Sequence, residues 1–568
     1  DRQMVEHCSF IEVTPGRPPV PQDRLTHGLQ SACPPFYRVR RANASAPFGP
    51  LEDNALVKSS EWEYNRQAIA PQKIVTRDVR RHSSLNDAPE PSKDRQTLES
   101  SAVRGMAGQR STVQSRVIDQ RYGVRRQLMS LAWPAVVEYL LQTALTAVAI
   151  VLVGRLGDVE IAAVGIGFQV LMVAWVAYFG LAMGAAALVA QYVGARDARR
   201  AEAVAKQSLV AGLIIAIATG AAGFALAGDI LAVLGAAPEV IAAGLDFLRI
   251  LLAFSPLLMV TVVGSGVLRG AGDMKTPMYI NTVTTILSIG LACALVFGQF
   301  GLPRLEVAGV AWAMVTSQLI GAMLLVMVLF LRPQYIRLSR SGHWLPSREI
   351  ARRLLAISGP SVLEQVFMRF GMLAYAVLVM SLGTAAYATQ QILFTIVNIS
   401  MMPGFAFATA ATTMVGQNVG AGQVRRAQRS GWAATELSAL WMSLAGVVFF
   451  VFARECLSLL TPDVHLVELG EPCLKIIALA QPPMAAAFAL AGALRGAGDA
   501  RWPMYTTTVT IWLLRLPLGY LFGIALAMGL TGVWLGHAID FAVRGGLLVW
   551  RYARGDWMSI RAPRKSVE

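Results

Sequence analysis

The chain has 568 residues, of which 55% are hydrophobic and only 15% are charged, and its mean hydropathy is +0.51. A soluble chain of this length would carry roughly a quarter of its residues as charges, so the composition excludes an ordinary soluble domain. The formal net charge of +15 suggests nucleic-acid binding at first sight, but the basic residues alternate between loops and do not form one patch.

Residues 1–124 are polar, rich in Pro, Ser, Arg, Asp and Glu, and show no helical or strand period. Such a composition buries too little apolar surface to offset the entropy of ordering, so it predicts a disordered N-terminal cytoplasmic tail. The stretch lacks the apolar core of a signal peptide, and acids such as Glu61 and Asp78 disfavour a transit peptide. Two interpretations stay open: a dispensable tail, or partly upstream sequence with a working start at Met106.

Twelve long apolar segments follow between about Gln127 and Trp550, six on each side of the charged stretch Arg332–Arg353. A membrane-spanning helix needs about 20 apolar residues, because the hydrocarbon core is ~30 Å thick and a helix rises ~1.5 Å per residue. The sequence therefore predicts an all-α membrane protein with twelve transmembrane helices. Its predicted parts are an N-lobe over 125–332, a cytoplasmic linker over 333–349, a C-lobe over 350–555 and a cytoplasmic tail over 556–568.

Basic residues gather in alternate loops of this membrane part. Arg199 and Arg200 follow the second segment and Arg425 follows the eighth, whereas the opposite loops mix few bases with acids such as Asp158 and Glu455. This asymmetry follows the positive-inside rule and predicts that both termini are cytoplasmic. The basic excess is therefore a topology signal, and we expect no nucleic-acid partner.

The two halves are an internal repeat. The sequence WPAVVE (Trp133–Glu138) returns as GPSVLE (Gly359–Glu364), and the difference 364 − 138 = 226 defines what we call the repeat offset. LRGAGDMKTPMY (Leu268–Tyr279) returns as LRGAGDARWPMY (Leu494–Tyr505) at the same offset. Six spans per half is an even number, so the repeats are parallel and related by an axis along the membrane normal. Two pseudo-symmetric six-helix lobes around a central cleft are typical of secondary transporters.

Prolines recur at the repeat offset. We expect them to lie in or near the ends of spans, at Pro134/Pro360 and Pro256/Pro482, or to start spans, at Pro277/Pro503. Inherited structural kinks are the favoured interpretation, and hinges that move are the alternative.

Motifs of catalysis do not occur in the sequence. It contains no GxxxxGK[ST], no HExxH and no recognisable triad, so we expect neither an enzyme nor a cofactor. We interpret the two RGAGD stretches as cytoplasmic turns, because glycine permits the backbone angles of turns. The five cysteines lack metal-ligand spacing; Cys456 and Cys473 flank an external loop, and free thiols are favoured over a disulfide.

Intramembrane acids are the main candidates for function. Glu138 and Glu364 occupy equivalent positions one turn after a proline. An acid at a helix centre costs about 2.5–3.5 kcal/mol on insertion scales, while each Leu, Ile or Val contributes about 0.3–0.6 kcal/mol in favour. These acids either bind a coupling proton or cation, or only satisfy backbone groups or a nearby cation; both interpretations stay open.

Further charges suggest a buried network. Arg369, five residues after Glu364, is the predicted ion-pair partner of that acid. Asp540 and Arg544 are four residues apart, which suits a pair on one helix, and Arg515 is a similar candidate. Asp540 joins Glu138 and Glu364 as a coupling candidate. Candidates for lining the cleft are Tyr139, Gln142, Asn281, Met368, Met372, Gln391 and Asn398. Methionines such as Met172 are favoured as packing over pocket lining.

These motifs together resemble the multidrug and toxic compound extrusion (MATE) family, in its prokaryotic branch. The motifs that show this resemblance are P-x-x-x-E with VGRLG in the first span, PGFAFATAATTMVGQNVGAG (Pro403–Gly422) in the eighth, and LRGAGD-x-x-x-P after spans four and ten. The resemblance covers about residues 125–555. It implies a monomeric twelve-helix exporter in the bacterial cytoplasmic (inner) membrane, which exchanges Na⁺ or H⁺ for amphipathic, often cationic compounds and needs no cofactor.

The chain departs from the family pattern in three spans. Ala149 stands in place of an acid in the first span, and Met368 corresponds to a glutamate of the seventh span in some relatives. In the fifth span, Ser288 and Ala292 stand where relatives often carry the Asn and the Asp of N-x-x-L-D. We therefore expect Glu138 and Glu364 to take over coupling, with Arg369 and Asp540 modulating them. A lipid-linked saccharide flippase or metabolite exporter and a membrane receptor or scaffold remain alternatives, and the sequence leaves the coupling ion and the substrate open.

Overall fold

The computed structural model describes residues 123–153, 157–298, 305–331, 338–339, 344 and 347–559, except for the side chains of 144, 146–153 and 158. All of these residues belong to one compact unit, Glu90–Glu568. The predicted N-terminal tail with Met106, and the tail beyond residue 559, lie outside the described residues.

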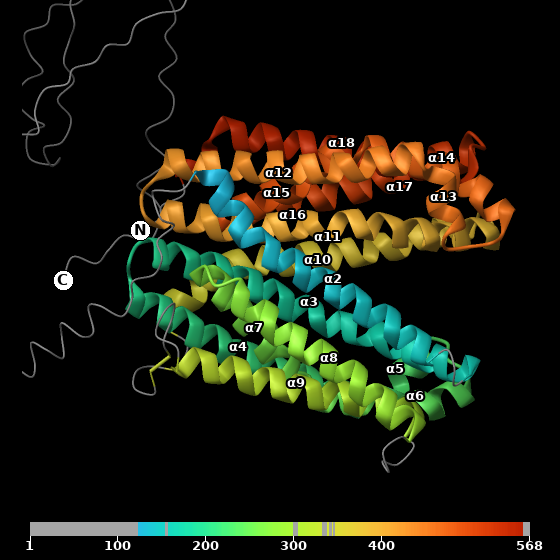
Figure 1. Ribbon diagram of the computed structural model, residues 1–568, viewed down its shortest axis with the longest axis horizontal. Helices are drawn as coiled ribbons and strands as arrows, with labels where there is room; N and C mark the ends of the chain where they lie inside the picture. Colours follow the sequence, from blue (N-terminus) through green and yellow to red (C-terminus); the bar gives the residue numbers. More distant parts are fainter. Residues whose placement is uncertain are drawn as a thin grey trace, which may run out of the picture. The chain divides into compact units, whose positions relative to one another are not determined.

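The described residues fold almost entirely into helices, in two bundles (Figure 1). The N-lobe consists of α2 (Val124–Val153), α3 (Asp158–Gly194), α4 (Ala198–Ala225), α5 (Ala227–Val233), α6 (Pro238–Ala253), α7 (Ser255–Ala271), α8 (Lys275–Phe297) and α9 (Glu306–Leu331). The C-lobe consists of α10 (Arg348–Met380), α11 (Thr384–Gly420), α12 (Val424–Val451), α13 (Ala453–Ser458), α14 (Val464–Leu479), α15 (Gln481–Ala497), α16 (Arg501–Thr510), η2 (Ile511–Arg515), α17 (Leu516–Tyr520), η3 (Leu521–Ala525) and α18 (Gly529–Arg554), followed by the short η4 (Asp556–Ser559).

The helix bounds repeat at the offset found in the sequence. Helices α11, α12, α14 and α15 begin and end one repeat offset after α3, α4, α6 and α7. The turns repeat as well, since Gly272 and Gly498, the last glycines of the two RGAGD stretches, both have a left-handed φ of 97°. Only glycine adopts this conformation without strain, so the interpretation of these stretches as turns is confirmed.

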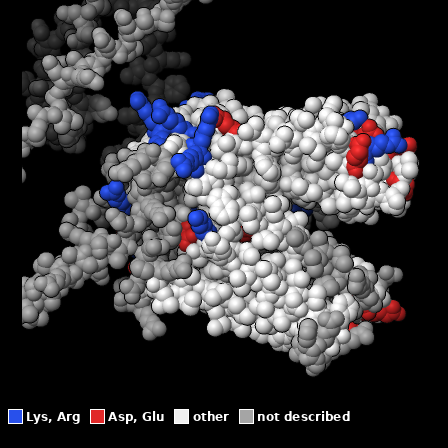
Figure 2. Space-filling view, in the orientation of Figure 1, with Lys and Arg blue, Asp and Glu red and all other residues white. Residues whose placement is uncertain are grey.

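The helices account for twelve membrane spans. Eight single helices are long and apolar enough to cross a membrane, and two bent pairs bring the number to ten. Helices α2 and α18, of 30 and 26 residues, are also long enough to cross a membrane, so the count is consistent with the predicted twelve. Charged surface gathers mainly at the two ends of the bundle in Figure 2, and the outer surface between them is largely uncharged. The chain is thus a multi-pass α-helical membrane protein.

The bent pairs show where two of the repeated prolines lie. Pro256 and Pro482 lie at the break inside a span, between α6 and α7 and between α14 and α15. The bends measure 49° and 54°. Proline has no N–H to donate and its ring displaces the preceding turn, so the helix changes direction there.

Small residues set the distance between neighbouring helices. A Cβ atom on Gly266 or Gly270 of α7 would lie 2.7 or 2.4 Å from a carbonyl oxygen of α3. A Cβ atom on the equivalent Gly492 or Gly496 of α15 would lie 2.2 or 2.3 Å from a carbonyl oxygen of α11. Lipid offers no hydrophobic drive for helix association, so close packing of backbones through small residues holds each lobe together.

The first helix of each lobe crosses to the other lobe. Figure 1 shows α2 starting beside α12 of the C-lobe and ending beside the N-lobe, and α2 packs against α8, α11 and α12. Helix α10 does the converse, because it packs against α3 and α4 as well as α16 and α17. The two lobes are therefore joined through α2, α3, α10 and α11.

Candidate functional site

The lobes meet most closely at the end of the bundle that carries the Gly272 and Gly498 turns, which we call the inner end. There a Cβ atom on Gly194 of α3 would lie 1.9 Å from the Gln417 carbonyl oxygen, and one on Gly420 of α11 would lie 1.8 Å from that of Gln191. No side chain fits at either glycine, so the two backbones touch.

Reciprocal hydrogen bonds close the same end. The Gln191 Nε2 donates to the Gly496 carbonyl at 2.9 Å, and the Gln417 Nε2 donates to the Gly270 carbonyl at 3.2 Å. The two donors are separated by the repeat offset, as are the two acceptors, so the exchange obeys the pseudo-twofold symmetry. At the outer end, which carries α5 and α13, Figure 2 shows a hollow between the lobes with basic surface at its depth. The structure is thus closed at the inner end and open at the outer end.

Glu138 is buried between α2, α7 and α8. Its carboxylate forms an ion pair with Arg269 of α7 and accepts a hydrogen bond from the Asn281 side-chain amide of α8. Glu138 is central in α2, yet Arg269 lies two residues before the end of α7 at Ala271. The pair therefore lies toward the inner end of the bundle.

Glu364 repeats this arrangement in the C-lobe. One Arg495 nitrogen lies 2.7 Å from each carboxylate oxygen, and the Thr507 hydroxyl donates to the carboxylate at 3.0 Å. All three residues lie one repeat offset after their N-lobe counterparts, with Thr507 in place of Asn281. Two symmetric Glu–Arg pairs thus tie the first helix of each lobe to the helix that ends in the RGAGD turn.

The predicted Arg369–Glu364 ion pair is wrong. Five residues on an α-helix correspond to a rotation of about 140° from the starting side chain, so the two residues project from different faces of α10. The true partner of Glu364, Arg495, comes from the RGAGD stretch, which the sequence identified only as a turn. The shared offset of both glutamates and both arginines is the signal that could have found these pairs.

A second charge cluster exists in the C-lobe alone. Asp540 of α18 is fully buried and binds two arginines, Arg515 of η2 and Arg544 one turn further along α18. Arg515 Nε lies 2.8 Å from Asp540, as does Arg544 NH2, and Arg544 Nε donates to Thr510 at 3.0 Å. The predicted Asp540–Arg544 pair and the network role of Arg515 are confirmed.

The N-lobe carries no counterpart of this cluster. At the equivalent positions it has Met314, Gln318 and Ile289 in place of Asp540, Arg544 and Arg515. The helix differs too, because α8 is continuous where the C-lobe has the π-helical turns η2 and η3. Pro517 has no N–H for the carbonyl of the preceding turn, and a π-turn accommodates this loss.

His537 is a buried polar residue that sequence reasoning missed. Its ring stacks on Trp534 at 5.3 Å and meets Tyr375 edge-on at 5.6 Å, one turn before Asp540. Its Nδ1 has no hydrogen-bond partner in the part of the chain that the structure describes. The N-lobe has Ala311 here, so comparing the repeats would have singled out this histidine.

The other candidates divide into two groups. Asn281 belongs to the Glu138 site, and the buried Ser288 and Ala292 occupy the fifth-span positions without an acid. Ala149 lies among the side chains that are not described. The remaining predicted cleft residues are exposed or half-buried on α2, α10 and α11: Tyr139, Gln142, Met368, Met372, Gln391 and Asn398. Tyr139 approaches Thr409 of the opposite lobe at 3.5 Å, and Gln391 donates to Tyr387 at 2.9 Å.

Cys456 and Cys473 are free thiols, as the sequence favoured.

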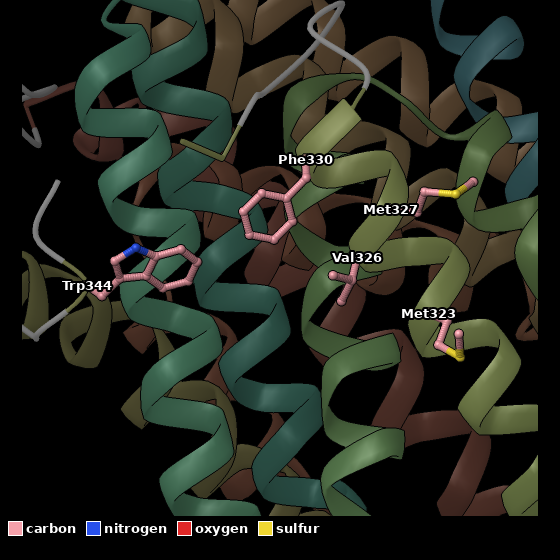
Figure 3. A pocket seen from close by; sticks show the side chains of 5 residues that line it. All are labelled: Met323, Val326, Met327, Phe330 and Trp344. Atoms are coloured by element: carbon pink, nitrogen blue, oxygen red, sulfur yellow. The ribbon is translucent and has the colours of Figure 1, made fainter. Parts of the chain in front are cut away.

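A separate apolar hollow of about 510 Å³ lies on α9, outside the region between the lobes. Figure 3 shows Trp344 facing Phe330 there, beside Met323, Val326 and Met327. Its lining is apolar and its position is peripheral, so it is suited to lipid chains and not to the charged chemistry of the lobes.

Comparison with known proteins agrees with this architecture. The MatE family matches residues 134–294 and 360–521, which lie in the two lobes. The chain belongs to the MatE family. It is 31% identical over 441 residues to "Probable multidrug resistance protein NorM" of Thermotoga maritima, covering 76% of this chain and 93% of that protein. It is 32% identical to the protein of the same name from Rhodopseudomonas palustris, covering 75% of this chain and 90% of the relative.

A solved structure, "Outward-facing conformation of a multidrug resistance MATE family transporter of the MOP superfamily", superposes with a TM-score of 0.73. It shares 23% identity and covers 77% of this chain and 97% of its own. The predicted MATE-like fold of two six-helix lobes is therefore confirmed.

Proposed function

We propose that this MatE-family chain is a secondary active multidrug efflux transporter of the bacterial inner membrane. It exports amphipathic organic compounds by alternating access, with both termini in the cytoplasm and as a monomer. The observation that carries this proposal is the pair of pseudo-symmetric lobes, which is closed at the inner end and hollow at the outer end. Relatives named as multidrug resistance proteins support the same function.

The proposed coupling ion is the proton, acting at Glu138 and Glu364. Each carboxylate already faces an arginine, and a sodium ion at the same place would meet the positive charge of that arginine. A proton instead neutralises the carboxylate and frees Arg269 or Arg495. That release would loosen the first helix of the lobe from the helix ending in the RGAGD turn, which allows the lobes to rock.

Asp540 has a different proposed role. Two arginines hold its carboxylate, so loss of one contact leaves the other in place. We assign the Asp540 cluster, including Arg515 and Arg544, to positioning the C-lobe helices around Glu364. The ring of His537 lies beside this cluster and packs against Phe541.

Dye efflux from proteoliposomes with imposed gradients tests the proposal. The full chain should drive transport with a pH gradient and not with a sodium gradient. Glu138→Gln and Glu364→Gln should each remove gradient-driven efflux while the protein is still inserted, because glutamine keeps the shape but takes up no proton. Sodium-driven transport would overturn the choice of ion, and full activity in the double variant would overturn the site.

The same assay separates the alternatives. Movement of a lipid-linked saccharide without dye efflux would favour a flippase. No gradient-dependent movement of any solute would favour a receptor or scaffold. The family match and the named relatives favour efflux over both.

A further inference from the structure

Arg369 is a membrane-embedded cation that the proposed coupling does not use. It lies on α10, eleven residues before the end of the helix at Met380. Eleven residues correspond to about 16 Å of helix, roughly half of a ~30 Å hydrocarbon core. Arg369 is therefore near the middle of the membrane, where a charge is costly to keep without a purpose.

No acid compensates for this arginine among the residues that the structure describes. Glu138, Glu364 and Asp540 are each paired with other arginines. The polar contact of Arg369 is the thioether sulfur of Met172, 3.6 Å away on α3 of the opposite lobe. Sulfur is a weak acceptor, so the guanidinium remains able to bind an anion.

The position of Arg369 on α10 places it at the closed end of the hollow between the lobes. Val362, two helical turns earlier on the same face, touches α3, since a Cβ atom on Gly180 would lie 2.4 Å from the Val362 side chain. One turn before Val362, Ser358 makes the same kind of contact with Gly184. Beyond these contacts the helices separate enough for the exposed Arg369 to reach across to Met172.

The scaffold does not require an arginine at this position. The pseudo-symmetric residue of the N-lobe, one repeat offset earlier, is Thr143, which is also exposed and donates only to the Tyr139 carbonyl. The lobe thus packs in the same way without the charge. A cation present in one lobe alone, and facing the hollow, indicates a role in binding.

We propose that Arg369 binds the anionic group of the transported compound, so that the preferred substrates are amphipathic molecules with a carboxylate. This inference rests on the proposed efflux function and deepens it, and it departs from the cationic substrates that the sequence suggested. Met172, which contacts Arg369, and the exposed Met372, three residues further along α10, provide adaptable apolar surface for the rest of the molecule. Arginine matches a carboxylate through two parallel hydrogen bonds, which fixes orientation as well as charge.

Binding of two dyes tests the proposal: rhodamine 110, with a free carboxylate, and rhodamine 123, its methyl ester. The full chain is placed in phosphatidylcholine nanodiscs, and fluorescence polarisation gives both dissociation constants. Wild type should bind rhodamine 110 about tenfold more tightly than rhodamine 123, as expected for a charge-assisted contact. Arg369→Gln should bring this ratio to about one by weakening rhodamine 110 alone, and Arg369→Lys should retain a preference.

A matched control is Arg454→Gln, which removes an exposed arginine of α13 away from the hollow and should keep the wild-type ratio. Equal binding of the two dyes by wild type, or a preference that survives Arg369→Gln, would overturn the inference. So would loss of the preference on adding phosphatidylglycerol, because Arg369 would then bind a lipid headgroup. Binding needs no gradient, so failure of gradient-driven efflux is a separate result that concerns only the proposed function.

Discussion

Asp540 faces two arginines, whereas Glu138 and Glu364 face one each. Neutralising Asp540 would leave two buried positive charges close together without a counter-charge. Removing one partner from a buried ion pair typically costs about 3–5 kcal/mol, and replacing the whole set by apolar residues is often neutral. At the equivalent positions the N-lobe carries an uncharged set, Met314, Gln318 and Ile289.

We expect Asp540→Asn to lower the free energy of unfolding by about 3–5 kcal/mol, because Arg515 and Arg544 lose their shared partner. The triple variant Asp540→Met, Arg544→Gln and Arg515→Ile, which carries the N-lobe residues, should recover most of that loss. Thermal unfolding in detergent, followed by intrinsic fluorescence, measures both. A triple variant as unstable as Asp540→Asn would show that the C-lobe depends on the charges themselves.

Sequence reasoning found pairs that one helix determines and missed pairs between helices. Asp540 and Arg544 lie one turn apart on α18, so their spacing alone predicts contact. Glu364 lies sixteen residues after the start of α10, whereas Arg495 lies two residues before the end of α15, and spacing along the chain does not show that these two positions meet. Arg369 was assigned to Glu364 for lack of that information.

At the scale of helices, the repeat predicted more than single segments did. The repeat offset reappears in the bounds of α3 and α11 and in both RGAGD turns. The crossing of α2 and α10 between lobes was not predictable, because both helices have apolar residues on every side. The π-helical η2 ends two residues before Pro517, but the sequence does not specify this distortion, since several distortions can accommodate one missing N–H.

The contact between α3 and α11 predicts a local effect of two substitutions. Gly194→Ala and Gly420→Ala each place a methyl group within 2 Å of a carbonyl oxygen of the opposite helix, at Gln417 or Gln191. The inner ends must then separate, and we expect amide hydrogen exchange there to speed up about tenfold or more. Mass spectrometry of peptides covering residues 187–195 and 413–421 measures this exchange.

The matched control is Gly165→Ala, also on α3, where nothing lies within 4 Å of the added Cβ atom. It adds the same methyl group to α3 at a position where the group meets no other helix. Unchanged exchange at the inner end in all three variants would mean that the α3–α11 contact does not hold this end closed.

For the whole molecule, twelve spans and alternating loop charge predict how the bundle crosses the membrane. An even number of spans places both termini on one side, and the basic loops predict that this side is the cytoplasm. The short helix α13 then lies outside, together with Cys456. Partial burial, and less strongly the neighbouring Glu455 carboxylate, raise the pKa of the Cys456 thiol.

Labelling with a membrane-impermeant maleimide tests this topology. In intact cells Cys456 should react, whereas Cys8 and Cys33 of the predicted cytoplasmic tail should react only after permeabilisation. The thiolate is the reactive form, and its fraction at neutral pH is small because the pKa is raised. Labelling should therefore be slow at pH 7 and speed up about tenfold at pH 8. In a Cys293→Ser background, Cys456→Ser should remove the signal from intact cells, since Cys293 is the other half-buried free thiol and Cys473 is buried. A signal that needs permeabilisation would place α13 in the cytoplasm and reverse the direction of transport proposed for the open hollow.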